Sequence, residues 1–109
     1  MNYHESSNDR YDKELKDYLN GKGQDRLLLV SANNYLVYID VEEDKASLKE
    51  LQLLVGGYIE VYPKEEENFL YLVDEEGLLK QKPFNSLAKK LFDVDVVGDL
   101  VLCPKRLFD

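Results

Sequence analysis

Residues 47–62 predict a helix that turns directly into a strand. Ser47 stands at the helix start and Glu50 follows three residues later, the capping-box spacing that satisfies two otherwise unpaired amides. Gly56 and Gly57 then end the helix, because glycine tolerates the left-handed backbone at that point. Residues 58–62 alternate apolar and polar side chains, as a strand with one solvated face does. The segment therefore requires a fold that mixes helix and sheet.

Hairpin patterns lie on both sides of this segment. Apolar runs over residues 27–30 and 35–41 are separated by an Asn-Asn turn, and the second run is apolar on both faces, which predicts a central strand. Residues 69–73 and 78–82 predict another hairpin, which turns at Gly77. The remaining segments predict a short helix over 86–92, capped by Asn85, and a last strand over 96–102. The order predicts an α+β fold, in which two short helices pack on one face of a mostly antiparallel sheet.

An amphipathic helix is predicted ahead of these elements. Four apolar side chains recur at the spacing that places them on one stripe of a helix: Tyr11, Leu15, Tyr18 and Leu19. Such a short helix is marginal alone, so the stripe either covers the domain or meets a partner. We expect residues 1–26 to form this helix and a connector, and residues 27–109 to form a single α+β domain.

The charge balance excludes some partners. The 109-residue chain has 22 acidic and 14 basic residues, a net charge of -8, which disfavours direct binding to nucleic acids or anionic membranes. Cys103 is the only cysteine, as suits a reducing compartment. No apolar run reaches the ~18 residues of a membrane helix. We therefore expect a cytoplasmic protein.

No catalytic, metal-binding or cofactor-binding constellation is expected. Glu60 and the acidic residues 74–76 bring carboxylates of the kind that hold a hard cation, but their spacing is not that of a calcium loop. No nucleophile and base are paired with them. Gly56 and Gly57 follow a helix, whereas a phosphate-binding loop precedes one. These patterns predict turns and solvated surfaces rather than chemistry.

Tyrosines and acids are the strongest candidates for a binding surface. The chain has eight tyrosines, and Tyr58 and Tyr62 flank Glu60 on one face of a predicted strand. They either line the sheet beneath the helices or form an exposed platform for a protein partner. Acidic residues that would extend such a surface are Glu42, Glu43, Asp44, Glu65, Glu66 and Glu67.

Four motifs in order resemble an uncharacterised domain family common on bacteriophages, plasmids and their hosts. They are the Leu51–Glu60 string, the Asp74–Gly77 turn, Pro83 with Asn85 and Ala88, and Val97-Gly98. The resemblance covers roughly residues 27–103, and Asp74 stands where the family usually has Asn. It implies a small accessory protein of a mobile element, or a domesticated relic of one, and no known activity. The positions expected to serve as turns or caps are Gly56, Gly57, Gly77, Asn85 and Gly98.

These observations predict a non-enzymatic protein-binding module that is able to form a homodimer. One specific form is an acidic DNA mimic, which would inhibit a host defence protein or another DNA-binding protein by occluding its basic groove. The alternative is a domain that binds a small, nucleotide-like ligand between sheet and helix.

Overall fold

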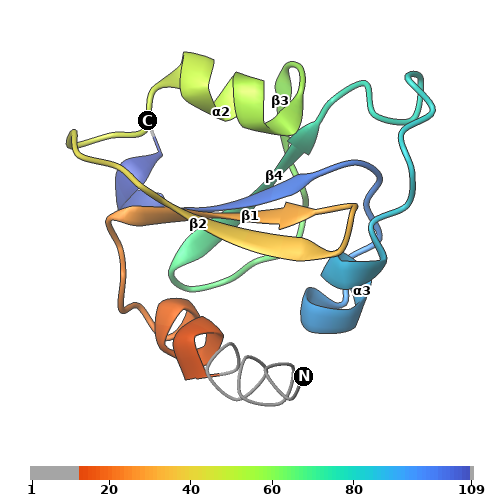
Figure 1. The fold of residues 1–109 in the computed structure, drawn as a ribbon. Coiled ribbons are helices and arrows are strands. Elements are labelled where there is room, and N and C mark those ends of the chain that lie inside the picture. Colours follow the sequence, from red (N-terminus) through yellow and green to blue (C-terminus); the bar gives the residue numbers. More distant parts are fainter. Residues whose placement is uncertain (1–12, 109) are drawn as a thin grey trace, which may run out of the picture.

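The computed structural model describes residues 13–108, whose centre is a five-stranded sheet with every neighbouring pair antiparallel (Figure 1). The strand order across the sheet is β2-β1-β5-β4-β3. Residues 13–19 are helical. The remaining elements are β1 (Arg26–Ser31), β2 (Tyr35–Asp40), α2 (Leu48–Val55), β3 (Ile59–Val61), β4 (Phe69–Asp74), α3 (Ser86–Phe92), β5 (Leu100–Pro104) and the 3-10 turn η1 (Lys105–Leu107).

Helices cover both faces of the sheet, so the prediction that they share one face is wrong. α2 packs on one face, while α3 and the helix of residues 13–19 lie on the other (Figure 1). The reason is visible in the central strands, where neighbouring residues are both fully buried. Leu28 and Leu102 belong to the core beneath α3, whereas Leu27 and Val101 belong to the core beneath α2. Two apolar faces require two covering layers.

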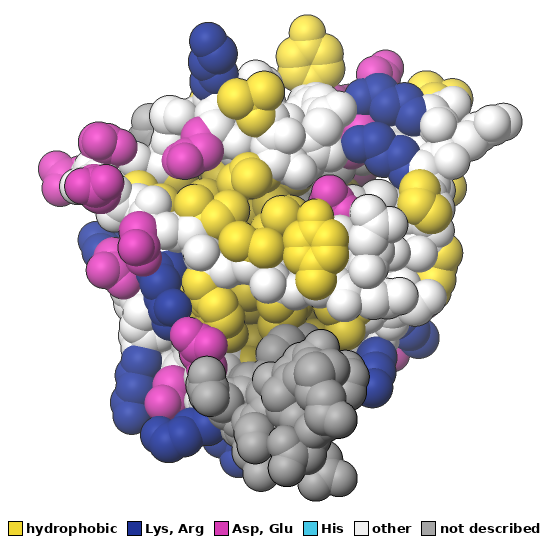
Figure 2. Space-filling model, in the orientation of Figure 1, with side chains coloured by type: hydrophobic (Ala, Val, Ile, Leu, Met, Phe, Trp, Pro, Cys, Tyr) yellow, Lys and Arg dark blue, Asp and Glu magenta, His cyan; other side chains and the backbone are white. Residues whose placement is uncertain are grey.

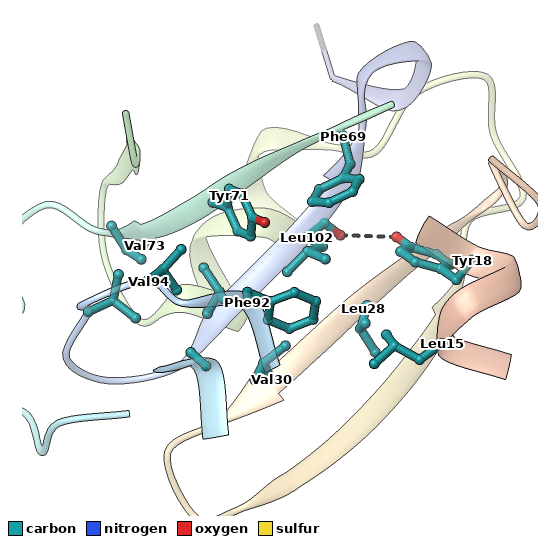
Figure 3. Packing of buried hydrophobic residues seen from close by; sticks show 13 residues of the cluster. Leu15, Tyr18, Leu28, Val30, Phe69, Tyr71, Val73, Phe92, Val94 and Leu102 are labelled. Atoms are coloured by element: carbon teal, nitrogen blue, oxygen red, sulfur yellow. Dashed lines mark hydrogen bonds between the residues drawn. The ribbon is translucent and has the colours of Figure 1, made fainter. Parts of the chain in front are cut away.

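The helix of residues 13–19 packs on the domain. Leu15 and Tyr18 are buried against the core that also contains Leu28 and Phe92 (Figure 3). The Tyr18 hydroxyl lies 2.8 Å from the carbonyl oxygen of Arg26 and 3.3 Å from that of Leu102. The described part of the apolar stripe therefore covers the sheet, which is the first of the two alternatives that the sequence left open. Tyr11 lies outside the described residues.

β2 is an edge strand, so the prediction that it is central is wrong. Leu36 and Tyr38 pack against the core on the side of the helix of residues 13–19, and this explains one apolar face. On the opposite face Tyr35 is 48% exposed and Val37 is 37% exposed. Within residues 13–108, this second apolar face is therefore incompletely covered.

The predicted strand over residues 78–82 is also wrong, because this segment forms successive turns. The amide of Lys80 donates to the carbonyl of Glu76, and the amide of Lys82 donates to that of Gly77. These local hydrogen bonds leave little for a strand partner, and both Leu78 and Leu79 are 81% exposed. β5 begins only at Leu100, later than the predicted strand over 96–102, because Val97 pairs with Phe84 in an isolated bridge outside the strands.

Candidate functional site

A buried carboxylate at the end of β4 is the centre of the polar structure in this protein. The side chain of Asp74 is 1% exposed, and its Oδ2 atom lies 2.8 Å from Lys80 Nζ and 2.7 Å from Lys82 Nζ. Its Oδ1 atom accepts a hydrogen bond of 2.9 Å from the amide of Glu76. Both lysines come from the irregular segment that follows β4. This segment therefore folds back onto Asp74, the residue from which it starts.

The same two lysines also hold the C-terminal end of α2. Lys80 Nζ donates to the carbonyl of Gly56, and Lys82 Nζ donates to that of Val55, each over 2.9 Å. The last carbonyls of a helix lack partners within the helix and carry partial negative charge, so ammonium groups stabilise them. α2 has no basic residue in its own last turn. The loop after β4 supplies that charge from a distant part of the chain.

The protonation state of Asp74 follows from these contacts. Burial of the carboxyl acts to raise its pKa, but hydrogen bonds from Lys80, Lys82 and the Glu76 amide outweigh it and lower the pKa to about 2. Asp74 is therefore ionised at neutral pH. A carboxylate that is ion-paired with two ammonium groups is a poor general base, because these contacts lower its affinity for a proton.

Glycines make room for this junction, which we call the Asp74 junction (Asp74, Lys80 and Lys82). A Cβ on Gly57 would lie 2.6 Å from Asp74 Oδ1 and 2.7 Å from Lys80 Nζ. Gly98 has a φ of 75°, and a Cβ there would lie 2.7 Å from Lys82 Cδ. Gly56, at the C-cap of α2, has a φ of 87°. Close approach and left-handed backbone thus both require glycine around the two lysines.

Asn85 joins α3 to the sheet rather than lining a ligand site. It is fully buried, and its Oδ1 atom accepts from the amide of Ala88 as the N-cap of α3. Its Nδ2 atom donates to the carbonyls of Val30 and Gly98, each over 2.9 Å. One side chain therefore satisfies three buried backbone groups from three segments.

A small recess borders the Asp74 junction and contains two of the predicted binding residues. It has a volume of about 160 Å³, and Glu60 and Tyr62 line it together with Asp95 and an apolar floor that includes Val73 and Val96. The Tyr62 hydroxyl accepts a hydrogen bond from the amide of Asp95. Tyr58 is 67% exposed and does not line the recess. Of the three predicted platform residues, the recess therefore brings together Glu60 and Tyr62.

The predicted acidic residues fall into two groups with different surroundings. Glu42, Glu43 and Asp44 are exposed and line an open hollow together with Asp25, Asp40, Val41 and Arg106. In the second group, Glu66 accepts a hydrogen bond of 2.7 Å from the Tyr71 hydroxyl, while Glu65 lies 3.9 Å from Lys105. Burial and the Glu66 contact raise the pKa of Tyr71 above its usual range. The first group therefore shares one hollow with two further acids, whereas Glu66 of the second group is engaged by a tyrosine.

Three further features of the described residues concern metal ions, the cysteine and membranes. Across residues 13–108, no three side chains of His, Cys, Asp or Glu are grouped as ligands for a metal ion. Cys103 is fully buried, and burial raises the pKa of its thiol to about 12. Every helix in the same part of the chain is too short or too polar to cross a bilayer.

Sequence reasoning missed the roles of Lys80 and Lys82, which it places only in the second strand of a predicted hairpin. No local pattern links them to Val55, because the helix end, the strand end and the turn meet only in three dimensions. Asp74 was considered only as a carboxylate at the tip of a hairpin. Its burial depends on the fold of the loop that follows it.

Comparison with known proteins identifies the family of this chain. No curated protein and no solved structure matches this chain. A family model does match residues 26–106, which is more than half of the chain and includes all five strands and the Asp74 junction. The chain belongs to the family described as "Domain of unknown function (DUF3846)".

Proposed function

We propose that this protein is a non-enzymatic protein-binding module, an accessory protein of a mobile genetic element. The supporting observation is the open hollow beyond the end of β2, lined by the carboxylates of Asp25, Asp40, Glu42, Glu43 and Asp44. Of its lining residues only Arg106 is basic. A surface of this kind suits a basic protein surface, and the net charge of -8 strengthens the attraction at long range.

The mechanism is occlusion of a basic groove on a DNA-binding or defence protein. Closely spaced carboxylates present negative charge as DNA phosphates do, and electrostatic complementarity speeds association and selects the partner. Because the charges are exposed, salt weakens the interaction. Glu66 contributes less to such a surface than Glu43, since its carboxylate is engaged by Tyr71.

The test compares two charge-reversal variants of the full chain in capture experiments from lysates of candidate hosts. One variant carries Glu42→Lys, Glu43→Lys and Asp44→Lys in the hollow. Its control carries Glu65→Lys, Glu67→Lys and Glu75→Lys, the same change in net charge at exposed positions outside the hollow. A partner must be captured by the wild type and the control, lost by the hollow variant, and released by salt. If no captured protein behaves in this way, the proposal is wrong.

A second candidate function rests on the recess beside Glu60. At about 160 Å³ it is smaller than the 300–1,000 Å³ of typical ligand pockets, and carboxylates line it together with an apolar floor. A nucleotide is therefore too large and carries the wrong charge for this recess. The ligand it suits is a compact organic cation, such as a short alkylamine, with its chain on Val73 and Val96.

Thermal unfolding in the presence of n-butylammonium, with adenosine monophosphate as the comparison, tests this second function. Binding predicts that the amine raises Tm, that the nucleotide does not, and that Glu60→Gln removes the rise. Glu67→Gln, at an exposed position outside the recess, is the matched control and should retain it. Equal rises for both variants would show that the amine acts on the protein surface in general.

A further inference from the structure

The two edges of the sheet are built differently. β3 has three residues with Glu60 at its centre, and Pro63 follows shortly after, so this edge is short and charged. β2 has six residues, Tyr35–Asp40, and pairs with β1 in unbroken register from end to end. No described strand pairs with its outer side. Soluble proteins usually protect an edge with lysine, proline, a bulge or a covering element. β2 has none of the first three.

One face of β2 is also apolar and incompletely covered. Tyr35, Val37 and Ile39 alternate on the side of the sheet that carries α2, but α2 packs over β3, β4 and β5. Tyr35 and Val37 are consequently exposed, and Ile39 is only partly buried. Figure 2 shows apolar side chains gathered in the middle of the face that carries β2, with acidic side chains on one flank.

We infer that a second copy of this chain covers β2, by antiparallel pairing of β2 with itself about a two-fold axis. A continuous sheet requires that directly opposite residues point to the same face, so the register is restricted to even offsets. Centring the axis on Val37 places Val37 opposite its own copy and Tyr35 opposite Ile39. The exposed apolar side chains of both copies then form one cluster, the kind of cross-strand contact that stabilises sheets.

This register also keeps the acidic residues of the two chains apart. Asp40 falls opposite Asn34, which is uncharged and ends the pairing because its φ of 69° turns the chain away. The acidic residues 42–44 of the two copies then lie at opposite ends of the interface. A parallel arrangement would instead place Asp40 beside Asp40 and bring the two acidic segments together. Charge therefore selects the antiparallel two-fold arrangement. The inference is independent of what the acidic hollow binds.

The first test is the mass of the full chain in solution over a range of concentrations, by light scattering or sedimentation equilibrium. We expect a particle of twice the 12.7 kDa of one chain. Val37→Lys places like charges together at the axis and should give monomers. The control is Val61→Lys, an exposed valine on the other edge strand, which should remain dimeric. Mixing Val37→Lys with Val37→Glu should restore the dimer, which shows that the lysine variant is folded.

A second test reads the register. Val37→Cys should form a disulfide-linked dimer under a mild oxidant, because opposite Cβ atoms lie about 5 Å apart in an antiparallel pair. Tyr35→Cys should not, although residue 35 is more exposed, since the two copies of residue 35 would be about 13 Å apart at 3.3 Å per residue. Cys103 is fully buried and does not compete.

Three results would overturn the inference or its register. A wild-type mass of one chain at all concentrations would mean that no second copy covers β2. A dimer that survives Val37→Lys and is lost in Val61→Lys would place the contact on β3. Efficient cross-linking through Tyr35→Cys, with none through Val37→Cys, would refute the proposed register.

Discussion

Asp74 at the end of β4 lies 2.7 Å from the Nζ atom of Lys82, and the same ammonium group donates to the last carbonyl of α2, that of Val55. A single pair of residues thus connects a central strand, an irregular loop and a helix end. The carboxylate is almost completely buried, whereas the lysine side chain retains 22% exposure. Breaking a buried ion pair costs more than forming it contributes, because it leaves an uncompensated charge.

Asp74→Asn should therefore destabilise the protein although it preserves the shape of the side chain. We expect a loss of about 2–3 kcal/mol in the free energy of unfolding, near the lower end for a buried pair because both lysines reach solvent in part. The measurement is urea unfolding followed by circular dichroism at fixed protein concentration. Asp93→Asn, which removes a partner of Lys89 at an 80% exposed carboxylate, should cost much less than Asp74→Asn. Equal effects of the two variants would contradict this role for Asp74.

The contribution of Asp74 should depend on pH in a defined window. Its pKa is about 2 in the folded protein and roughly 3.9 in an unfolded chain, so acid protonates the unfolded state first. The stabilisation is complete above the unfolded value and disappears as pH falls toward 2. The difference in stability between wild type and Asp74→Asn should therefore be constant from neutral pH to roughly pH 5 and shrink below roughly pH 4. A difference that does not change across this window would show that Asp74 is not the titrating group.

Gly57→Ala should disturb the Asp74 junction through close approach. The added Cβ would meet Asp74 Oδ1 at 2.6 Å, and that carboxylate cannot move without breaking its contacts to Lys80 and Lys82. Overpacking of this kind costs about 1–3 kcal/mol. In the background of Asp74→Ala the carboxylate is gone and no longer holds Lys80 Nζ against Gly57, so the same change should cost much less. Additive losses in the double variant would mean that Gly57 is required for some other reason.

Asn85 should prove to be more than a helix cap. Asn85→Ala removes partners from the amide of Ala88 and from the carbonyls of Val30 and Gly98, for an expected loss of about 3 kcal/mol. Ser47→Ala removes an exposed cap from α2 and should cost only about 1 kcal/mol. Asn85→Asp keeps the capping oxygen but loses both donors and adds a buried charge. If the aspartate variant is as stable as wild type, capping is the whole role of this residue.

Several features follow from the sequence because their causes are local. The capping pattern at Ser47, the left-handed end of α2 at Gly56 and the cap of α3 at Asn85 depend on residues within one turn of each other. Strands β1 and β4 are recognisable because both their faces are apolar over a short run. The α+β class and the antiparallel sheet follow from the order of these segments.

The tertiary structure decided what each apolar face and each charge meets. β2 has the apolar pattern of a central strand and yet lies at an edge, because burial depends on neighbours that its own sequence does not specify. Lys80 and Lys82 resemble any solvated lysines until the turn after β4 brings them onto Asp74 and the end of α2. Local hydrogen bonds and side-chain alternation act within a few residues, so the sequence alone determined the elements and their caps. Contacts between distant segments determined the sheet edges, the buried ion pairs and the exposed apolar face of β2.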